Sequence, residues 1–389
     1  MIIPALKMRA PIRMVCVVTL AASALFAHGL PPAADQISSA SAGHGNNRAF
    51  NVTALDEKGQ PVKDLASADF QIFEDGKPQA IATFNPLFAA SSGKNPPTTT
   101  LILFDLLNVF AGQRENSATL IVRALQPLDG RNMIYLYLLT NHGDLYNVAS
   151  TTQQTAAPSQ GSTDHKPPDS PWTQQARPLL DQAIAKVNAL RIKDYQDEGV
   201  SAAATFLALN QLGDAFTKIP GPKTIVWITR GAPNWLDYRY GCKDVVFSEG
   251  SESYVGGRCG NDCTRRPGMS KCVDYTPFLQ HFGGELARSD TIFYSVMVDP
   301  EGSIYGTDRG RPRDTLQQLA DLSGGRMYAR GEIDQAIAQS LQDVRARYQL
   351  TYDAPAPDGK YHKLRVECSR KGVIIEAPRG YYAEQPRQK

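Results

Sequence analysis

The chain has 389 residues, of which 42% are hydrophobic and 21% are charged. This length is enough for one large domain or two moderate ones, each with a sizeable core. The formal net charge of +2 is close to neutral, so the composition gives no electrostatic reason to expect binding to nucleic acid or to an anionic membrane.

The N-terminus has the pattern of a secretory signal. Lys7, Arg9 and Arg13 precede an apolar run that ends at Ala27 and is shorter than the roughly 20 residues needed to span a bilayer. We therefore predict a signal peptide over residues 1–29, a secreted or periplasmic protein, and no membrane span after cleavage. Cleavage would lower the formal net charge from +2 to −1. An uncleaved N-terminal anchor is the alternative.

Two further segments precede the larger part of the chain. Residues 30–48 are rich in Ala, Ser, Gly, Pro and Asn, a composition that predicts a flexible leader. In residues 49–90, apolar side chains such as Phe50 and Val52 alternate with polar ones, and turn residues recur every ten residues or so. This pattern predicts a β-rich, immunoglobulin-like segment.

Residues 98–346 alternate between predicted strands and helices. Strands are expected at 101–105, 132–139, 145–148, 224–229 and 291–298, and helices near 113–126, 174–190, 199–218, 275–288, 314–322 and 332–346. The strand sequences are mostly continuous apolar runs, as in parallel strands buried on both faces. The fold class predicted for this part is therefore α/β, Rossmann-like, with a mostly parallel sheet flanked by helices. The polar stretch 149–173 is expected to be a loop.

A second long loop, 231–273, contains four of the five cysteines that remain after signal cleavage. These are Cys242, Cys259, Cys263 and Cys272. In an oxidising compartment they are expected to form two local disulfides, with the connectivity open. A structural zinc site is the competing interpretation, although the spacing has no Cys-x-x-Cys pair and no histidine pair nearby. Cys368, the fifth, alternates with apolar residues and is predicted to be a buried free thiol.

Residues 347–382 return to a strand pattern. Short apolar segments occur at 348–352, 362–368, 372–376 and 380–382. We expect these strands to complete a β-rich companion domain with the N-terminal strands, which would make the α/β domain an insertion. Separate small β units at each end are the alternative.

Several motifs, taken in their order along the chain, resemble the exported von Willebrand factor A-related proteins of acidobacteria. They include Asp56-Glu57-Lys58-Gly59, Glu74-Asp75-Gly76-Lys77, Leu322-Ser323-Gly324-Gly325 and Asp358-Gly359-Lys360-Tyr361. The likeness covers roughly residues 50–382. It implies an A-type Rossmann-like domain with a β-rich companion and no established enzymatic activity.

In A domains that bind Mg²⁺, oxygen ligands from three loops at the carboxyl edge of the sheet surround the ion. The resemblance matches Asp105 to the first-loop aspartate, but it places Leu107 and Val109 where two serines belong. Arg230 falls at the third-loop aspartate, and Ser201 or Thr205 could supply the second-loop hydroxyl. The metal site is therefore expected to be degenerate.

Three interpretations of this edge stay open. Asp105 and Arg230 could form an ion pair that replaces the metal. Asp105 could instead cap the following helix or bond loop amides. Weak Mg²⁺ binding could also persist, with Asp105, Asn108, Ser201 and Thr205 as ligands.

The loop 231–273 also carries aromatic and basic residues of the types that dominate binding hot spots. The candidates for partner contacts are Trp235, Tyr238, Arg239, Tyr240 and Arg258. The alternative is a surface excursion whose aromatic side chains pack on one another.

The sequence has no Gly-x-Ser-x-Gly, no phosphate-binding Gly-x-x-x-x-Gly-Lys-Ser/Thr and no His-Glu-x-x-His motif. No catalytic residues are assigned and no cofactor is expected beyond weakly bound Mg²⁺. The preferred hypothesis is an exported, non-enzymatic binding or adhesion module that recognises a protein or cell-envelope partner without a tightly bound metal. Metal-dependent adhesion is the alternative, and a hydrolase acting at the same sheet edge is a less favoured one.

Overall fold

The computed structural model describes residues 47–88, 98–126, 133–140, 143–150, 171–189, 198–237, 245–249, 252–256, 272–298, 312–328 and 332–383. These residues belong to one compact unit, Gly45–Lys389. The predicted signal peptide 1–29 lies outside the described residues, as does most of the predicted leader 30–48. The last two leader residues, Asn47 and Arg48, open the first strand. Within the described ranges, no helix is long and apolar enough to cross a membrane.

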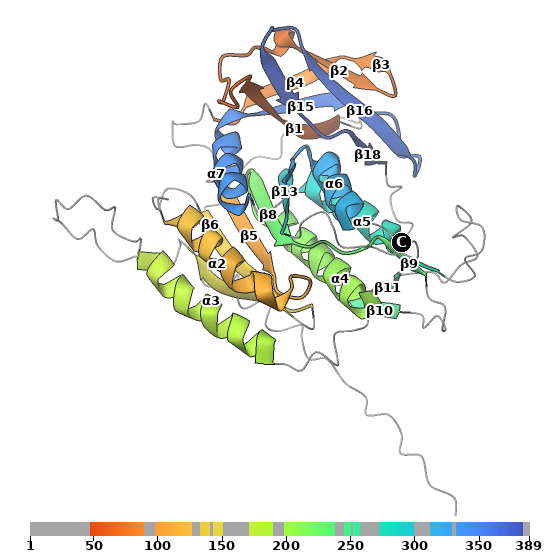
Figure 1. The fold of residues 1–389 in the computed structure, drawn as a ribbon. Coiled ribbons are helices and arrows are strands. Elements are labelled where there is room, and N and C mark those ends of the chain that lie inside the picture. The colour runs from red at the N-terminus through yellow and green to blue at the C-terminus, as the bar shows by residue number, and fades with distance from the viewer. Residues whose placement is uncertain are drawn as a thin grey trace, which may run out of the picture. The chain divides into compact units, whose positions relative to one another are not determined.

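A six-stranded sheet, in the order β14-β13-β8-β5-β6-β7, forms the centre of the α/β part (Figure 1). Only β7 is antiparallel to its neighbour. Three strands, β5, β8 and β13, are buried along their whole length, which explains their continuous apolar sequences. The strand bounds are β5 (Thr99–Asp105), β6 (Met133–Leu139), β7 (Leu145–Ser150), β8 (Lys223–Thr229), β13 (Thr291–Met297) and β14 (Met327–Tyr328).

The strand order reverses between β5 and β8. The chain builds the sheet outward from β5 through β6 to β7, then returns to the other side of β5 with β8, β13 and β14. Such a reversal separates the loops that leave the two central strands, and α/β sheets bind ligands in the resulting crevice at their carboxyl edge. The topology alone therefore directs attention to the ends of β5 and β8.

Helices cover both faces of this sheet (Figure 1). One face packs on α2 (Ala111–Leu125), α3 (Pro171–Ala189) and α7 (Ile333–Asp343). The other packs on α4 (Glu198–Thr217), α5 (Thr276–Arg288) and α6 (Pro312–Ser323). Each face thus has its own hydrophobic core, and the predicted α/β fold class with a sheet flanked by helices is confirmed.

The element bounds differ from the predicted ones mainly at helix ends. The helix expected over 332–346 ends at Asp343 and continues as a 3-10 turn, Val344–Ala346. This 3-10 turn comes directly before Arg347, whose backbone is extended because Arg347 is the first residue of the next strand. Strand β7 extends to Ser150, into the expected loop 149–173, and α3 begins at Pro171.

Strands from both ends of the chain pair with one another in two antiparallel four-stranded sheets, β17-β1-β15-β4 and β18-β16-β2-β3. A third apolar cluster, including Val52, Ile72 and Tyr348, draws on both sheets. That they form a companion domain in their own right stays a prediction. The bounds are β1 (Asn47–Asp56), β2 (Phe70–Glu74), β3 (Lys77–Gln79), β4 (Ile81–Pro86), β15 (Arg347–Asp353), β16 (Tyr361–Cys368), β17 (Val373–Glu376) and β18 (Gly380–Tyr382), with a 3-10 turn at Ser67–Asp69.

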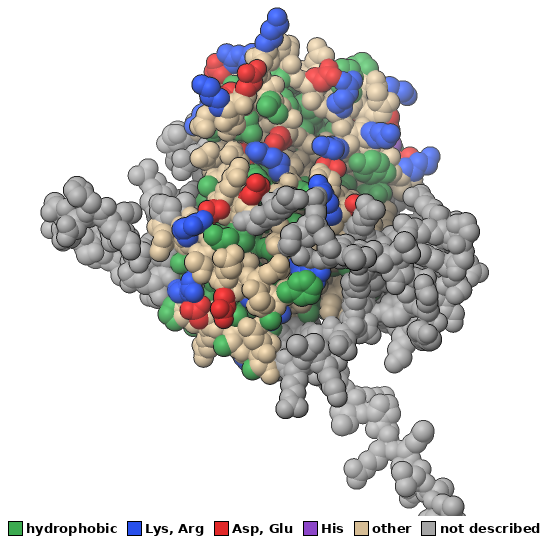
Figure 2. Space-filling view, in the orientation of Figure 1, with side chains coloured by type: hydrophobic (Ala, Val, Ile, Leu, Met, Phe, Trp, Pro, Cys, Tyr) green, Lys and Arg blue, Asp and Glu red, His purple; other side chains and the backbone are tan. Residues whose placement is uncertain are grey.

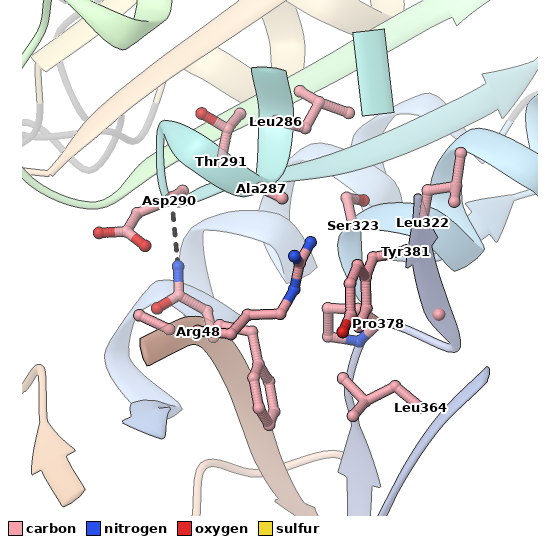
Figure 3. Close-up of a pocket in the computed structure, with 14 residues that line it drawn as sticks. Arg48, Leu286, Ala287, Asp290, Thr291, Leu322, Ser323, Leu364, Pro378 and Tyr381 are labelled. Atoms are coloured by element: carbon pink, nitrogen blue, oxygen red, sulfur yellow. Dashed lines mark hydrogen bonds between the residues drawn. The ribbon is translucent and has the colours of Figure 1, made fainter. Parts of the chain in front are cut away.

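These terminal strands contact the amino edge of the central sheet. The buried guanidinium of Arg347 donates to the Lys223 carbonyl (3.0 Å) and to Thr224 Oγ1 (2.6 Å) where β8 begins. Asn51 Nδ2 donates to the Asp290 carbonyl (3.2 Å), just before β13, and lines a small pocket there together with Tyr381 (Figure 3). The carboxyl edge of the sheet therefore lies at the other end from the terminal strands.

The predicted cysteine loop 231–273 contains two small antiparallel pairs. Strand β9 (Trp235–Asp237) pairs with β12 (Cys272–Asp274), and β10 (Val245–Glu249) pairs with β11 (Glu252–Gly256). Of the four clustered cysteines, Cys242, Cys259 and Cys263 lie outside the described residues, so the disulfides stay a prediction. Cys272 stands opposite Asp237 in the β9–β12 pair. Cys368 is a free thiol, as predicted, but it is half-buried where a buried one was expected.

Candidate functional site

Asp105 ends β5 at the strand reversal, and its carboxylate is fully buried. Thr229, the last residue of β8, donates from Oγ1 to Asp105 Oδ2 over 2.6 Å. Asn108 donates from Nδ2 to the same oxygen (2.8 Å) and from its backbone amide to Asp105 Oδ1 (2.9 Å). The carboxylate therefore accepts hydrogen bonds at both oxygens and ties the ends of the two central strands together.

The network continues into α4. The second hydrogen of Asn108 Nδ2 reaches Thr205 Oγ1 (2.8 Å), and this hydroxyl donates in turn to the Ser201 carbonyl (2.8 Å). An amide nitrogen has two donors, and both are used here. The structure thus brings together Asp105, Asn108, Thr205 and the backbone of Ser201, all of which the sequence singled out.

An arginine holds the loop that carries Asn108. Arg114, in the first turns of α2, donates from Nε to the Val109 carbonyl (2.9 Å) and from Nη2 to the Leu106 carbonyl (2.6 Å). Val109 is itself buried, and its amide bonds the Asp105 carbonyl (3.1 Å). These bonds fix the turn between β5 and α2 and leave little freedom to the groups around Asp105.

Burial is the main influence on the proton affinity of this site. Removal from water raises the pKa of Asp105 above its ordinary value, and the hydrogen bonds from Thr229, Asn108 and the Leu107 amide only partly oppose this. The hydrogen bonds to the Asp105 carboxylate come from a hydroxyl and from amide groups, all of which are neutral. Asp105 bonds a loop amide through Asn108, as one of the three sequence interpretations expects.

Arg230, the residue expected to pair with Asp105, follows β8 directly. Its guanidinium carbon lies 3.5 Å from the ring centroid of Phe110, which precedes α2. The Phe110 side chain is 51% exposed. The predicted ion pair between Asp105 and Arg230 stays a prediction, and Arg230 makes a cation–π contact with Phe110 at the solvent face of the edge.

The other predicted partner-binding residues belong to the cysteine loop. The backbone of Trp235 opens β9, which pairs with β12. Tyr238, Arg239, Tyr240 and Arg258 lie outside the described residues, so their role stays a prediction.

Three residues of the site were not assigned roles from the sequence: Thr229, Arg114 and Phe110. Thr229 could have been found, because a polar residue that ends a buried strand at the carboxyl edge is the same signal that picked out Asp105. Arg114 and Phe110 gave no such signal. Their contacts with backbone carbonyls and with Arg230 depend on how the loop folds.

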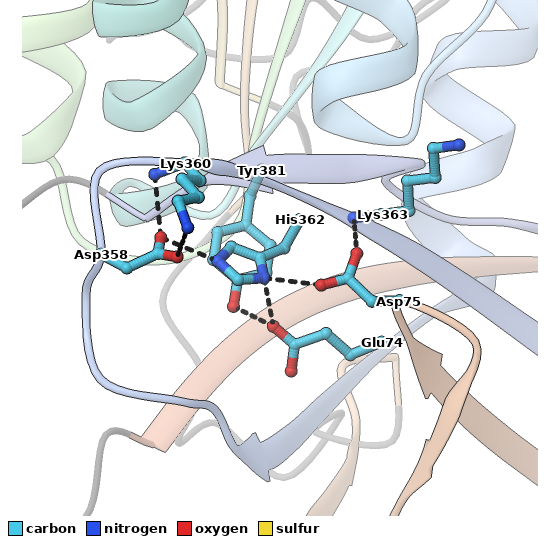
Figure 4. Close-up of polar contacts among 7 residues, drawn as sticks. All are labelled: Glu74, Asp75, Asp358, Lys360, His362, Lys363 and Tyr381. Carbon is cyan, nitrogen blue, oxygen red and sulfur yellow. Dashed lines mark hydrogen bonds and ion pairs between the residues drawn. The ribbon is translucent and has the colours of Figure 1, made fainter.

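A second polar cluster lies among the terminal strands (Figure 4). His362, on β16, contacts Asp75 Oδ2 through Nδ1 (2.8 Å) and Asp358 Oδ1 through Nε2 (3.0 Å). These two carboxylates raise the pKa of His362, the bond to Asp358 most. The pKa of Asp358 is lowered mainly by His362, and the pKa of Asp75 is lowered first by the Lys363 backbone amide and then by His362. Both ring nitrogens are engaged in a turn at the surface, so we regard this cluster as stabilising the β2–β3 turn rather than as a site.

The surface of the described residues carries charges of both signs. In the view of Figure 2, Lys and Arg side chains are interspersed with Asp and Glu over the described residues. The large hydrophobic side chains that are exposed among the described residues are scattered, and Phe110 is the one beside the Asp105 network. The others are Tyr146, Leu179, Tyr361 and Ile374.

No protein-family model and no curated protein matches this sequence. The solved structures to which it is similar include an aerotolerance-related membrane protein from Bacteroides fragilis, at 13% identity over 64% of this chain and 98% of that chain, with a TM-score of 0.32. The ArnB paralog VWA2 from Sulfolobus acidocaldarius is 11% identical over 87% and 76% of the two chains, with a TM-score of 0.28. The pilus adhesin RrgA from Streptococcus pneumoniae is 10% identical over 80% and 49%, with a TM-score of 0.32. Since identities and TM-scores are low, no functional argument rests on these likenesses.

Proposed function

We propose that this protein is an exported binding module related to von Willebrand factor A domains, and that it recognises a protein or cell-envelope partner without a tightly bound metal. The observation that carries the proposal is that Asp105 is buried and fully hydrogen-bonded within the chain. Its carboxylate lies at the carboxyl edge, where such domains hold Mg²⁺, but it is fully buried and both of its oxygens accept hydrogen bonds from Thr229 and Asn108.

The donor set at this edge does not fit a hard cation. Mg²⁺ needs near-octahedral oxygen ligands at about 2.0–2.1 Å. Leu107 and Val109 offer no side-chain oxygen, and the Thr205 hydroxyl already donates to a carbonyl and accepts from Asn108. The pKa of Asp105 is also raised by burial, which favours a proton rather than a free charge. We infer that hydrogen bonds inside the chain replace the ion.

Phe110 and Arg230 provide the recognition surface in this proposal. They project beside the network from the two loops that leave β5 and β8. Aromatic and arginine side chains are enriched at the energetic centres of protein interfaces. Their support is rigid, because Arg114 and Asp105 hold the β5–α2 turn. The cysteine loop, which follows the same strand β8, would extend this surface.

The absence of a tightly bound metal at Asp105 is tested by thermal melts of the protein in EDTA and then in millimolar Mg²⁺ or Ca²⁺, which the proposal expects not to bind. We expect the ions to leave the melting temperature unchanged in the native protein and in Asp105→Ala alike. An ion at 100 times its dissociation constant would add about 2.7 kcal/mol, a shift of a few degrees. Such a shift with Mg²⁺, lost in Asp105→Ala, would instead favour metal-dependent adhesion.

Recognition through the edge is tested by measuring how much labelled protein binds to isolated cell envelopes. The variant Phe110→Ala should bind at least about tenfold more weakly, as expected for a hot-spot residue. Tyr146→Ala is the matched control, since Tyr146 is an aromatic residue of similar exposure (57%) on the edge strand β7. Equal binding by the native protein and both variants would contradict the proposed surface.

A further inference from the structure

A separate group of metal-ligating side chains lies between α4 and α5, two helices that pack side by side on the same face of the sheet (Figure 1). It comprises Asp214 of α4 and His281 and Glu285 of α5, and one ligand atom of each lies within 4.8 Å of the others. His281 and Glu285 are four residues apart, so they share one face of α5. None of the three belongs to the Asp105 network.

Two of the three separations between ligand atoms in this group match those of atoms that share an ion, and the third is at most 4.8 Å. His281 Nε2 lies 3.8 Å from Asp214 Oδ1 and 3.8 Å from Glu285 Oε1. Both separations are longer than a hydrogen bond. Two ligands that each lie about 2.1 Å from the same ion can be at most about 4.2 Å apart, so both separations fit a shared ion. In the His362 cluster, by contrast, nitrogen and oxygen meet directly at 2.8 and 3.0 Å.

The packing of the two helices creates this convergence. Gly213, next to Asp214, has no side chain, and a Cβ there would lie 2.9 Å from Phe282 Cδ2 and 3.0 Å from Glu285 Cβ. The glycine therefore permits the close approach that brings the acid of α4 to the histidine and acid of α5. His281 and Glu285 are largely buried, while the Asp214 side chain is 42% exposed, which leaves a route from solvent.

A buried polar atom one helical turn away is consistent with a bound ligand. Asn210 is 6% exposed, and its Oδ1 has no hydrogen-bond partner among the described residues. Since Asn210 precedes Asp214 by four residues, both lie on the same face of α4. A buried acceptor without a donor is costly, and a water molecule held by an ion would supply that donor.

We propose that Asp214, His281 and Glu285 bind one divalent transition-metal ion, with Zn²⁺ the preferred ion, and that this ion clamps α4 against α5. One imidazole and two carboxylates are ligands that zinc accepts, with water completing the shell. Mg²⁺ and Ca²⁺ prefer oxygen ligands only, so they should bind this site poorly. The site does not depend on the function proposed for the Asp105 edge.

The test is a Zn²⁺ titration of the full chain, followed by competition with a chromophoric chelator. We expect one equivalent to bind the native protein, and His281→Ala to weaken that binding by at least about 100-fold. His362→Ala is the matched control, because this histidine also lies between two carboxylates, and it should bind Zn²⁺ as the native protein does. Absence of Zn²⁺ binding, or equal binding by His281→Ala, would overturn the proposal.

Two further measurements keep the test decisive. Asp214→Asn preserves the shape of a partly exposed side chain, so if His281→Ala does not fold by circular dichroism, loss of binding in Asp214→Asn supports the site and retention overturns it. Substitution with Co²⁺ reports the ligands. Visible bands without a sulfur-to-cobalt charge-transfer band are expected, whereas such a band would place the ion at cysteines and overturn the proposal.

Discussion

Two aspartates in the α/β part, Asp105 and Asp343, are both fully buried, yet their surroundings differ. Asp343, at the end of α7, accepts hydrogen bonds from the Arg326 guanidinium (2.7 Å), the Tyr294 hydroxyl (2.8 Å) and the Gln339 amide (2.9 Å). The hydrogen-bond donors to Asp105 carry no charge.

The difference lies in how the loss of hydration is compensated at each buried carboxylate. A buried charge is tolerated when a counter-charge and hydrogen bonds compensate for lost hydration, and Asp343 has both. The hydrogen bonds that Asp105 accepts come from uncharged groups, and they tie β5 to β8.

The largest expected loss of stability follows from removing Asp343, the buried partner of Arg326. Asp343→Ala removes one of the two carboxylate partners of Arg326, leaving Glu376, and also removes the acceptor of the Tyr294 hydroxyl, so it should reduce the free energy of unfolding by about 2–4 kcal/mol. Chemical denaturation measures this. Asp334→Ala removes the exposed partner of Arg123 and serves as the control, with an expected loss below about 1 kcal/mol. Similar losses in both variants would remove the distinction drawn for Asp343.

A smaller loss of stability is expected for substitutions of Asp105 at the carboxyl edge of the sheet. Asp105→Ala leaves the Thr229 hydroxyl and the Asn108 amide without their acceptor and should cost about 1–3 kcal/mol at neutral pH. Asp105→Asn keeps one acceptor oxygen and introduces no charge to bury, so it should cost less than Asp105→Ala. The same denaturation experiment compares them, and an equal cost would show that the negative charge of Asp105 is needed.

Asp105 should also make the free energy of unfolding depend on pH. Because the pKa of Asp105 is raised in the folded protein, its contribution is complete below the unfolded pKa of 3.8 and is lost as pH rises through the folded value. Asp105→Asn should therefore make stability less dependent on pH over that window. Asp343→Asn, in contrast, removes the counter-charge of Arg326 and should be destabilising at neutral pH.

Glu376, on β17, offers an intermediate case. Its Oε1 lies 2.6 Å from Arg326 Nε, yet burial raises its pKa to about 7. A raised value means that its contribution is complete below the unfolded pKa of 4.5 and is lost between there and about pH 7. Stability should fall by roughly 1–3 kcal/mol from pH 4.5 to pH 8, and this fall should shrink in Glu376→Gln. Glu115→Gln, on the exposed side of α2, should leave the profile unchanged.

The smallest effect on stability is expected for the His362 cluster among the terminal strands. The pKa of His362 is raised by Asp358 and Asp75, so an NMR titration of its ring should give a value above 6.5. Asp358→Asn should lower it more than Asp75→Asn does, because the bond to Asp358 contributes most. By linkage, the stabilisation is complete below pH 6.5 and is lost as pH rises through the folded value. A ring that titrates at 6.5 or below would contradict the geometry of this cluster.

Much of the α/β part could be predicted from the sequence. The apolar runs of β5, β8 and β13 identified buried parallel strands, and the periodicity of Ile333, Ile337 and Leu341 identified α7. The helix ends were less predictable, as at Val344–Ala346, because the start of β15 decides where the helix stops.

The candidate site was predictable only in part. Asp105 was found because a polar residue at the end of a buried strand is a local signal. Its partner Thr229 lies 124 residues away, and the choice between an ion pair, a metal and a hydrogen bond depends on which side chains meet there.

The sequence by itself determined the order and type of the elements and the position of Asp105 at the carboxyl edge, since periodicity and strand ends are properties of neighbouring residues. Only the tertiary structure decided that β1 pairs with β15, that Thr229 and Asn108 surround Asp105, and that Asp214 meets His281 and Glu285. Most of these contacts join residues far apart in the chain, and the contact between Asn108 and Asp105 depends on the conformation of the β5–α2 turn. Their geometry is set by packing, such as the close approach of α4 and α5 at Gly213, which leaves no local pattern in the sequence.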